Sequence, residues 1–97
     1  MMGTVAELMR SIDEVDEALV GLLVDRFELS RQIGLAKREL GQAPYDPERL
    51  RALTTRFVAL GSERGLAPGM AQLVISAIVA QAIVQRLEIF AAAPDGA

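Results

Sequence analysis

The sequence predicts an all-α fold of three helices, the first much longer than the other two. Two observations favour this fold: apolar residues recur at helical spacing through the first forty positions, and two later prolines follow residues that can begin a helix. With 97 residues, of which 52% are apolar, the chain is long enough for one domain with a substantial core. We therefore treat residues 1–97 as a single helical domain.

The first predicted helix covers residues 4–40. Its apolar positions follow steps of three and four, the pattern of a seam that faces a partner helix: Val5, Leu8, Ile12, Val15, Leu19, Leu22, Leu29, Ile33, Ala36 and Leu40. Thr4 can cap its start with Glu7 three residues later, and Gly41 can take the left-handed conformation at its end. Such a helix is about 54 Å long at 1.5 Å per residue. A globule of this size cannot cover it, so we expect a second chain to do so.

The second helix is predicted over residues 47–63 and the third over residues 67–91. Asp46 is a suitable N-cap, and Pro47 and Pro68 fit the first helical position, where a missing N–H costs nothing. The second helix carries an apolar stripe of Leu50, Leu53, Phe57 and Leu60. In the third helix the stripe runs from Met70 or Val74 through Ile78 and Ala82 to Ile89 or Phe90.

The composition argues against several kinds of function. Histidine and cysteine are absent, which disfavours zinc or copper sites and the usual nucleophile–base pairs, and we expect no cofactor. The net charge of −3 disfavours nucleic acid as a partner. No run approaches the ~20 apolar residues of a membrane span, and the first residues lack the pattern of a signal peptide. Together with the absence of cysteine, this favours the cytoplasm.

Two cations lie on or beside the apolar seam of the first helix. Arg26 occupies a seam position, and Lys37 lies about three turns further along the face formed by residues 26, 30, 33 and 37. Arg49 follows the predicted cap at Asp46 within one turn. This spacing suggests a positively charged cavity for a small dianion, with arginine–carboxylate contacts that offset desolvation. Alternatively, the aliphatic parts of Arg26 and Lys37 line the seam while their charged groups reach water and pair with Glu28 or Asp25.

The sequence from Ile12 to Leu53 resembles the all-helical class of chorismate mutase. That family carries I-D-x-(I/L)-D, an arginine after an apolar run, I-G-x-x-K and D-x-x-R. Here the matching positions are Ile12-Asp13-Glu14-Val15-Asp16, Arg26, Ile33-Gly34 with Lys37, and Asp46 with Arg49. The resemblance implies an intertwined homodimer whose long helices pair across the two-fold, with two pockets that each draw residues from both chains.

The resemblance also implies the rearrangement of chorismate to prephenate, a step of aromatic amino acid biosynthesis in the shikimate pathway. The reaction is unimolecular and needs no proton transfer, nucleophile or metal. Catalysis then comes from holding the compact conformer and placing cations at the developing negative charge. By the resemblance, Arg26 and Arg49 grip the two carboxylates, Lys37 donates to the ether oxygen, and the backbone around Asp46 meets the ring hydroxyl.

Several positions depart from the family pattern. The family's first arginine, which reaches the partner's pocket, is Met9 here, and its glutamate after the D-x-x-R arginine is Leu50. In an ungapped alignment, Ala82 replaces the family's serine and Arg86 replaces its glutamine. Arg86 then supplies either the second ether-oxygen donor or the carboxylate clamp that Met9 cannot provide. A one-residue deletion near Ala67 places Gln81 and Gln85 there instead.

Three functions therefore stay open. The first is a chorismate mutase with Arg26, Lys37 and Arg86 as catalytic residues. The second is a relative with another substrate, either an isochorismate–pyruvate lyase, which also lacks the glutamate, or a mutase of an amino-substituted chorismate. The third is a dimeric helical module that binds an anion or a larger partner without catalysis. Several helical chorismate mutases are activated by another shikimate-pathway enzyme, so such an enzyme is an expected partner.

Overall fold

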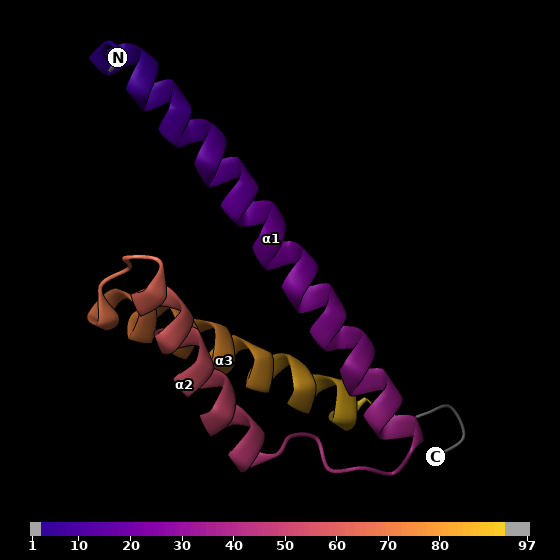
Figure 1. The fold of residues 1–97 in the computed structure, drawn as a ribbon. Coiled ribbons are helices and arrows are strands. Elements are labelled where there is room, and N and C mark those ends of the chain that lie inside the picture. Colours follow the sequence, from indigo (N-terminus) through magenta and orange to yellow (C-terminus); the bar gives the residue numbers. More distant parts are fainter. Residues whose placement is uncertain (1–2, 93–97) are drawn as a thin grey trace.

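The computed structural model describes residues 3–92 and contains three helices over that range, as the sequence predicts (Figure 1). Helix α1 spans Val5–Glu39, α2 spans Pro47–Glu63 and α3 spans Pro68–Ala91. Helices α2 and α3 form an antiparallel hairpin, and α3 packs across the C-terminal half of α1. The N-terminal half of α1 projects beyond the hairpin as an arm.

The residues expected to begin and end the helices do so. The Thr4 hydroxyl oxygen accepts a hydrogen bond from the Glu7 backbone N–H at 3.2 Å. The Glu7 carboxylate accepts from the Thr4 hydroxyl at 3.0 Å, and not from a backbone N–H. Asp46 Oδ1 accepts the Glu48 N–H at 2.9 Å at the start of α2. Gly41 follows the end of α1 with φ of +69°, which only glycine adopts without strain.

Helix α3 is the core helix of the chain. In the described residues, the buried apolar side chains are Ala71, Ile75 and Ile78, all on α3. The stripe was expected to begin at Met70 or Val74. Met70 is 51% exposed and Val74 is half-buried, whereas the buried stripe begins at Ala71. By length and composition alone α3 could cross a membrane, which was not expected from the sequence. Its contacts with both other helices account for this hydropathy as that of a core helix.

The face of α1 that meets α3 is not its apolar seam. Ser30 and Gly34 are the buried residues of α1, and Leu23 and Phe27 beside them are half-buried. These four positions follow one another at steps of three and four along one face. The predicted seam lies on an adjacent face and stays exposed along its whole length; Ile12 and Leu22, for example, are 59% and 66% exposed.

The exposed seam gives the subunit an open shape. Its principal extents are 62 × 27 × 15 Å, and its radius of gyration is 17.6 Å, compared with about 13 Å for a compact domain of this length. The accessible surface of 7431 Å² likewise exceeds the roughly 5,400 Å² expected for a globular 10.4 kDa monomer. The chain alone therefore leaves an apolar helix face without a covering layer.

Candidate functional site

A cavity of about 310 Å³ lies between the three helices, beside the C-terminal half of α1. All three helices and the connection between α1 and α2 contribute to its lining. The residues are Arg26, Leu29, Ser30, Ile33 and Lys37 from α1, Tyr45 and Asp46 from the connection, Arg49, Leu50 and Leu53 from α2, and Ala82 and Arg86 from α3. This volume falls in the range of small-molecule sites.

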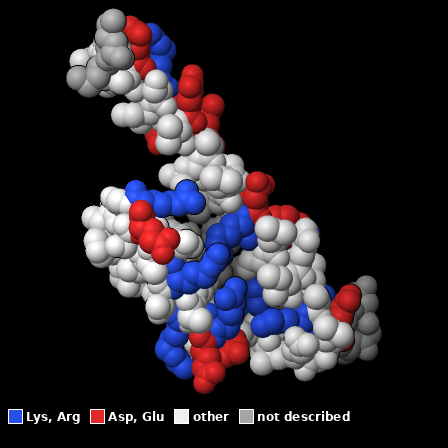
Figure 2. All heavy atoms as spheres, viewed as in Figure 1, with Lys and Arg blue, Asp and Glu red and all other residues white. Residues whose placement is uncertain are grey.

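The cavity is strongly positive although the chain as a whole is negative. Arg26, Lys37, Arg49 and Arg86 line it together with a single carboxylate, Asp46, one oxygen of which already caps α2. Figure 2 shows Lys and Arg side chains gathered between the lower half of α1 and the hairpin, with acidic residues along the arm. Cations that converge on one partly open cavity favour an anion as the occupant.

Carboxylates of the chain do not neutralise these cations. Within residues 3–92 the one ion pair joins Arg31 to Glu28 at 2.8 Å, on the solvent-exposed side of α1. The hydrogen bonds from Arg31 and then from Gln32 lower the pKa of Glu28 to about 2. Glu28 was one of the two carboxylates that could have paired with Arg26 or Lys37, but it is held by Arg31. Within residues 3–92, Arg26, Lys37 and Arg49 therefore have no carboxylate in an ion pair and can bind an anion from outside.

Arg86 differs from the other three cations in its surroundings. Its side chain is 9% exposed, and burial lowers the pKa of its guanidinium from the ordinary value. Nη1 donates to the Pro44 carbonyl oxygen at 2.8 Å, and Nη2 donates to both the carbonyl and hydroxyl oxygens of Ser30 at 3.1 Å. By contrast, Arg26 and Lys37 are half-buried and Arg49 is exposed.

Apart from the charged residues, Ser30 and Tyr45, the cavity wall is apolar. Leu29 and Ile33 from α1, Leu50 and Leu53 from α2, and Ala82 from α3 contribute it. An apolar wall excludes water and strengthens the interaction of the cations with a bound anion. The cavity thus suits a small anion with an apolar body.

Comparison with known proteins agrees with this geometry. The model of the family described as chorismate mutase type II matches residues 8–87, which include every residue of the cavity wall. The chain belongs to the type II chorismate mutase family. A protein named chorismate mutase from Methanocaldococcus jannaschii is 30% identical over 66 residues, which are 68% of this chain and 67% of that protein. Both findings support an isomerase of the chorismate mutase kind.

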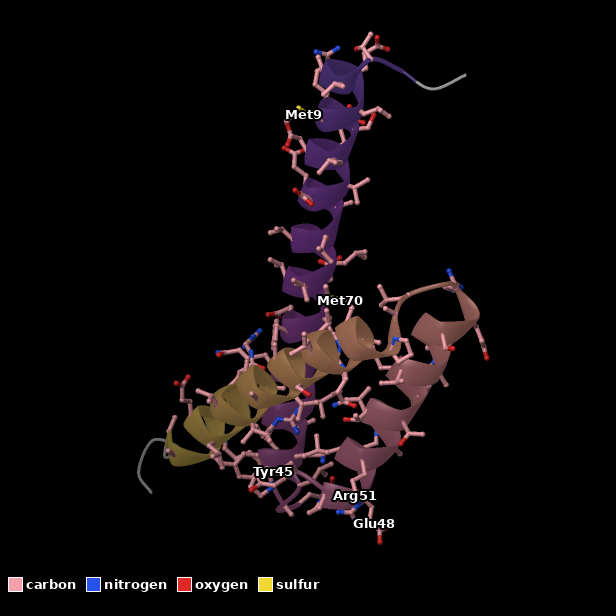
Figure 3. The ribbon with its side chains drawn as sticks, turned by 90° about the vertical axis from the view of Figure 1, so that its left-hand side faces the viewer. Met9, Tyr45, Glu48, Arg51 and Met70 are labelled. Atoms are coloured by element: carbon pink, nitrogen blue, oxygen red, sulfur yellow. The ribbon has the colours of Figure 1, made fainter. Side chains whose placement is uncertain are left out.

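Most residues that the sequence indicated lie together in the cavity of this chorismate mutase family member. Arg26, Lys37, Asp46, Arg49, Leu50, Ala82 and Arg86 all line it. Gln85 does not: its Nε2 donates to the Phe27 carbonyl oxygen at 3.2 Å, toward α1, and its Oε1 is buried without a partner in the described structure. Met9 lies near the end of the projecting arm, far from Tyr45 and the cavity, and is 61% exposed (Figure 3).

Five further residues line the cavity and were not named as site residues: Leu29, Ser30, Ile33, Tyr45 and Leu53. The sequence carried a signal for some of them. Ser30 and Ile33 share the helix face of Arg26 and Lys37, and Leu53 lies one turn after Arg49. Tyr45 precedes the Asp46 cap, but nothing in its spacing distinguishes it from an ordinary residue of a connection.

Proposed function

We propose that this chain is a chorismate mutase that rearranges chorismate to prephenate in the cationic cavity. The observation that carries the proposal is the convergence of Arg26 and Lys37 from α1 with Arg49 from α2 on one cavity with an apolar wall. Chorismate carries two carboxylates and an ether oxygen on an apolar ring. The two carboxylates and the ether oxygen give three acceptor groups for these three cations.

Each cation takes a distinct role in this mechanism. The guanidinium groups of Arg26 and Arg49 bind the two carboxylates and hold the substrate in its compact conformer. Lys37 donates to the ether oxygen, where negative charge grows as the carbon–oxygen bond breaks. The connection at Asp46 faces the ring hydroxyl. The rearrangement is unimolecular and needs no nucleophile or proton transfer, so the absence of histidine and cysteine is no obstacle to it.

A second copy of the chain completes the proposed enzyme. The apolar seam of α1 is exposed in one subunit, and the subunit's radius of gyration and surface area exceed those of a compact monomer. Leu29 and Ile33 belong both to that seam and to the cavity wall. A partner helix laid along the seam therefore also covers the open side of the cavity and shields it from water.

The test is turnover of chorismate by the purified protein, followed by loss of chorismate absorbance and identification of prephenate. We expect Lys37→Ala to lower kcat by about a hundredfold or more, as removal of a donor to the transition-state oxyanion does. Arg31→Ala on the same helix, which removes a cation outside the cavity, should leave kcat within about twofold. Wild-type turnover no faster than the uncatalysed reaction would overturn the proposal.

One observation favours a second substrate. Leu50 is half-buried in the cavity wall and offers no acceptor for a ring hydroxyl. A panel of chorismate, isochorismate and an amino-substituted chorismate separates these substrates, because salicylate with pyruvate identifies lyase activity. Tight binding of a bicyclic transition-state analogue without turnover would identify a non-catalytic module. Turnover that appears only after addition of a shikimate-pathway enzyme would identify an activating partner.

A further inference from the structure

The side chain of Arg86 joins three separate parts of the chain. It leaves α3, crosses α1 at Gly34 and ends between Ser30 of α1 and Pro44 in the connection. Its three hydrogen bonds, at 2.8, 3.1 and 3.1 Å, all go to oxygen atoms of the protein itself. Two of these oxygens are backbone carbonyls that belong to different segments. Arg86 is therefore a cross-link as well as a cation.

Gly34 provides the space through which Arg86 passes. A Cβ atom built on Gly34 lies 2.8 Å from Arg86 Nε, 2.9 Å from Arg86 Cδ and 3.0 Å from Ile89 Cδ1. Such distances are too short for carbon, so any side chain at position 34 displaces Arg86. Gly34 lies within α1, where glycine costs about 1 kcal/mol relative to alanine. Gly21, in the same helix, has no atom within 4 Å of its built Cβ.

The donors of Arg86 are mostly occupied. A guanidinium has five N–H groups, one on Nε and two on each Nη. Nη2 donates to both oxygens of Ser30, and Nη1 donates to the carbonyl oxygen of Pro44. Nε is buried against Gly34 and has no partner in the described structure. Both Nη atoms are thus already engaged by the protein and Nε is buried, which disfavours a bidentate contact with a carboxylate, because such a contact requires two parallel donors.

We propose that Arg86 is a positioning residue, which fixes the connection of residues 40–46 against α1 so that Tyr45 and Asp46 stay at the cavity wall. Pro44 directly precedes these two residues, and its carbonyl oxygen is held by Arg86. This assignment rests on the proposed function and differs from the direct catalytic role expected from the sequence. It also explains why position 34 is glycine, because the cross-link by Arg86 forms only if position 34 has no side chain.

The test compares Gly34→Ala with Gly21→Ala, two identical changes in one helix. We expect Gly34→Ala, which leaves Arg86 in the sequence but displaces it, to speed amide hydrogen exchange in residues 41–46 at least tenfold. It should lower kcat/KM for chorismate about tenfold, mainly through KM. Gly21→Ala should change neither quantity. Exchange and KM at wild-type values in a folded Gly34→Ala protein would overturn the proposal.

A second variant distinguishes the cross-linking role of Arg86 from the effect of its charge. It also provides the test if Gly34→Ala does not fold. Arg86→Lys retains the positive charge, but an ammonium cannot span the oxygens of Ser30 and Pro44 with the planar geometry of a guanidinium. We expect Arg86→Lys to show the same fast exchange in residues 41–46. Full rescue of exchange and KM by lysine would show that Arg86 supplies charge alone, and would overturn the proposal.

The exchange measurement needs no substrate, so it separates this proposal from the proposed function. If exchange is fast in Gly34→Ala but the wild type does not turn over chorismate, only the proposed function is overturned. If the wild type turns over chorismate but exchange is unchanged in both variants, only the proposed positioning role of Arg86 is overturned.

Discussion

Arg38 of α1 closes the C-terminal end of α3 by donating from Nη1 to the carbonyl oxygen of Ile89 at 2.9 Å. The same nitrogen donates to the carbonyl oxygen of Ala92, also at 2.9 Å. Helix α3 ends at Ala91 and is followed by Ala92, not by a left-handed glycine. A cation at a helix C-terminus satisfies carbonyls that have no partner within the helix and interacts favourably with the helix dipole.

Replacing Arg38 should therefore destabilise the junction of α1 with α3. We expect Arg38→Met, which keeps an apolar stem, to lower the free energy of unfolding by about 1.5–3 kcal/mol, the range for hydrogen bonds to a charged group. Urea unfolding at one fixed protein concentration measures this change. Arg51→Met, at an exposed site on α2, is the control and should stay within about 0.5 kcal/mol of wild type. Equal stability of the two variants would contradict the cap.

Arg49 and Arg51 on α2 form a matched pair for testing the carboxylate contact. Arg49 lines the cavity, whereas Arg51, near Glu48 at the N-terminal end of α2, does not (Figure 3). We expect Arg49→Ala to lower kcat/KM for chorismate about a hundredfold, largely through KM, because the carboxylate is bound in the ground state as well. Steady-state kinetics should show Arg51→Ala within about twofold of wild type. Similar losses in the two variants would argue against a role specific to Arg49.

Leu50 provides a test of substrate selectivity. A glutamate at this position would offer an acceptor to a ring hydroxyl of chorismate, so we expect Leu50→Glu to raise the ratio of kcat/KM for chorismate over isochorismate several-fold. Leu50→Met, of similar size and without an oxygen acceptor, is the control for volume. A fall in kcat/KM shared equally by both substrates would show that the new carboxylate pairs with the cations of the cavity instead.

The seam of α1 can be tested by adding charge to it. Leu19 lies on the seam and Val24 lies about on the opposite side of the helix, yet both are exposed, at 52% and 62%. We expect Leu19→Glu to shift a dimer toward monomer and to lower thermal stability, because a buried unpaired carboxylate costs several kcal/mol. Val24→Glu should remain dimeric. Sedimentation at several concentrations measures both; a monomeric wild type would contradict the proposed dimer.

Local sequence signals predicted the helices well because their physics is local. Thr4, Asp46 and Pro47 begin helices through contacts with residues two or three positions away, and Gly41 takes the positive φ that follows α1. The cationic cavity was also accessible from sequence, since Arg26 and Lys37 share a helix face and Asp46 fixes where Arg49 begins α2.

The contacts between helices were harder to predict. The apolar stripe of α1 predicted a face for a second chain, and it gave no indication of where α3 packs. Helix α3 packs on the weaker face that contains Ser30 and Gly34. The stripe is exposed in the described chain, and its covering by a second copy stays a prediction. The roles of Gly34 and Arg86 depend on a contact between two residues more than fifty positions apart. The periodicity of a single helix cannot predict such a contact.

The proposed pairing of the α1 arms would link the amount of active enzyme to how much protein is made. If pairing of arms completes each cavity, dissociation on dilution removes two sites at once, and specific activity falls as the protein is diluted. A cell with few copies of the chain would then gain less catalysis per molecule than one with many. Expression level would thereby act as a control on flux without any regulatory site.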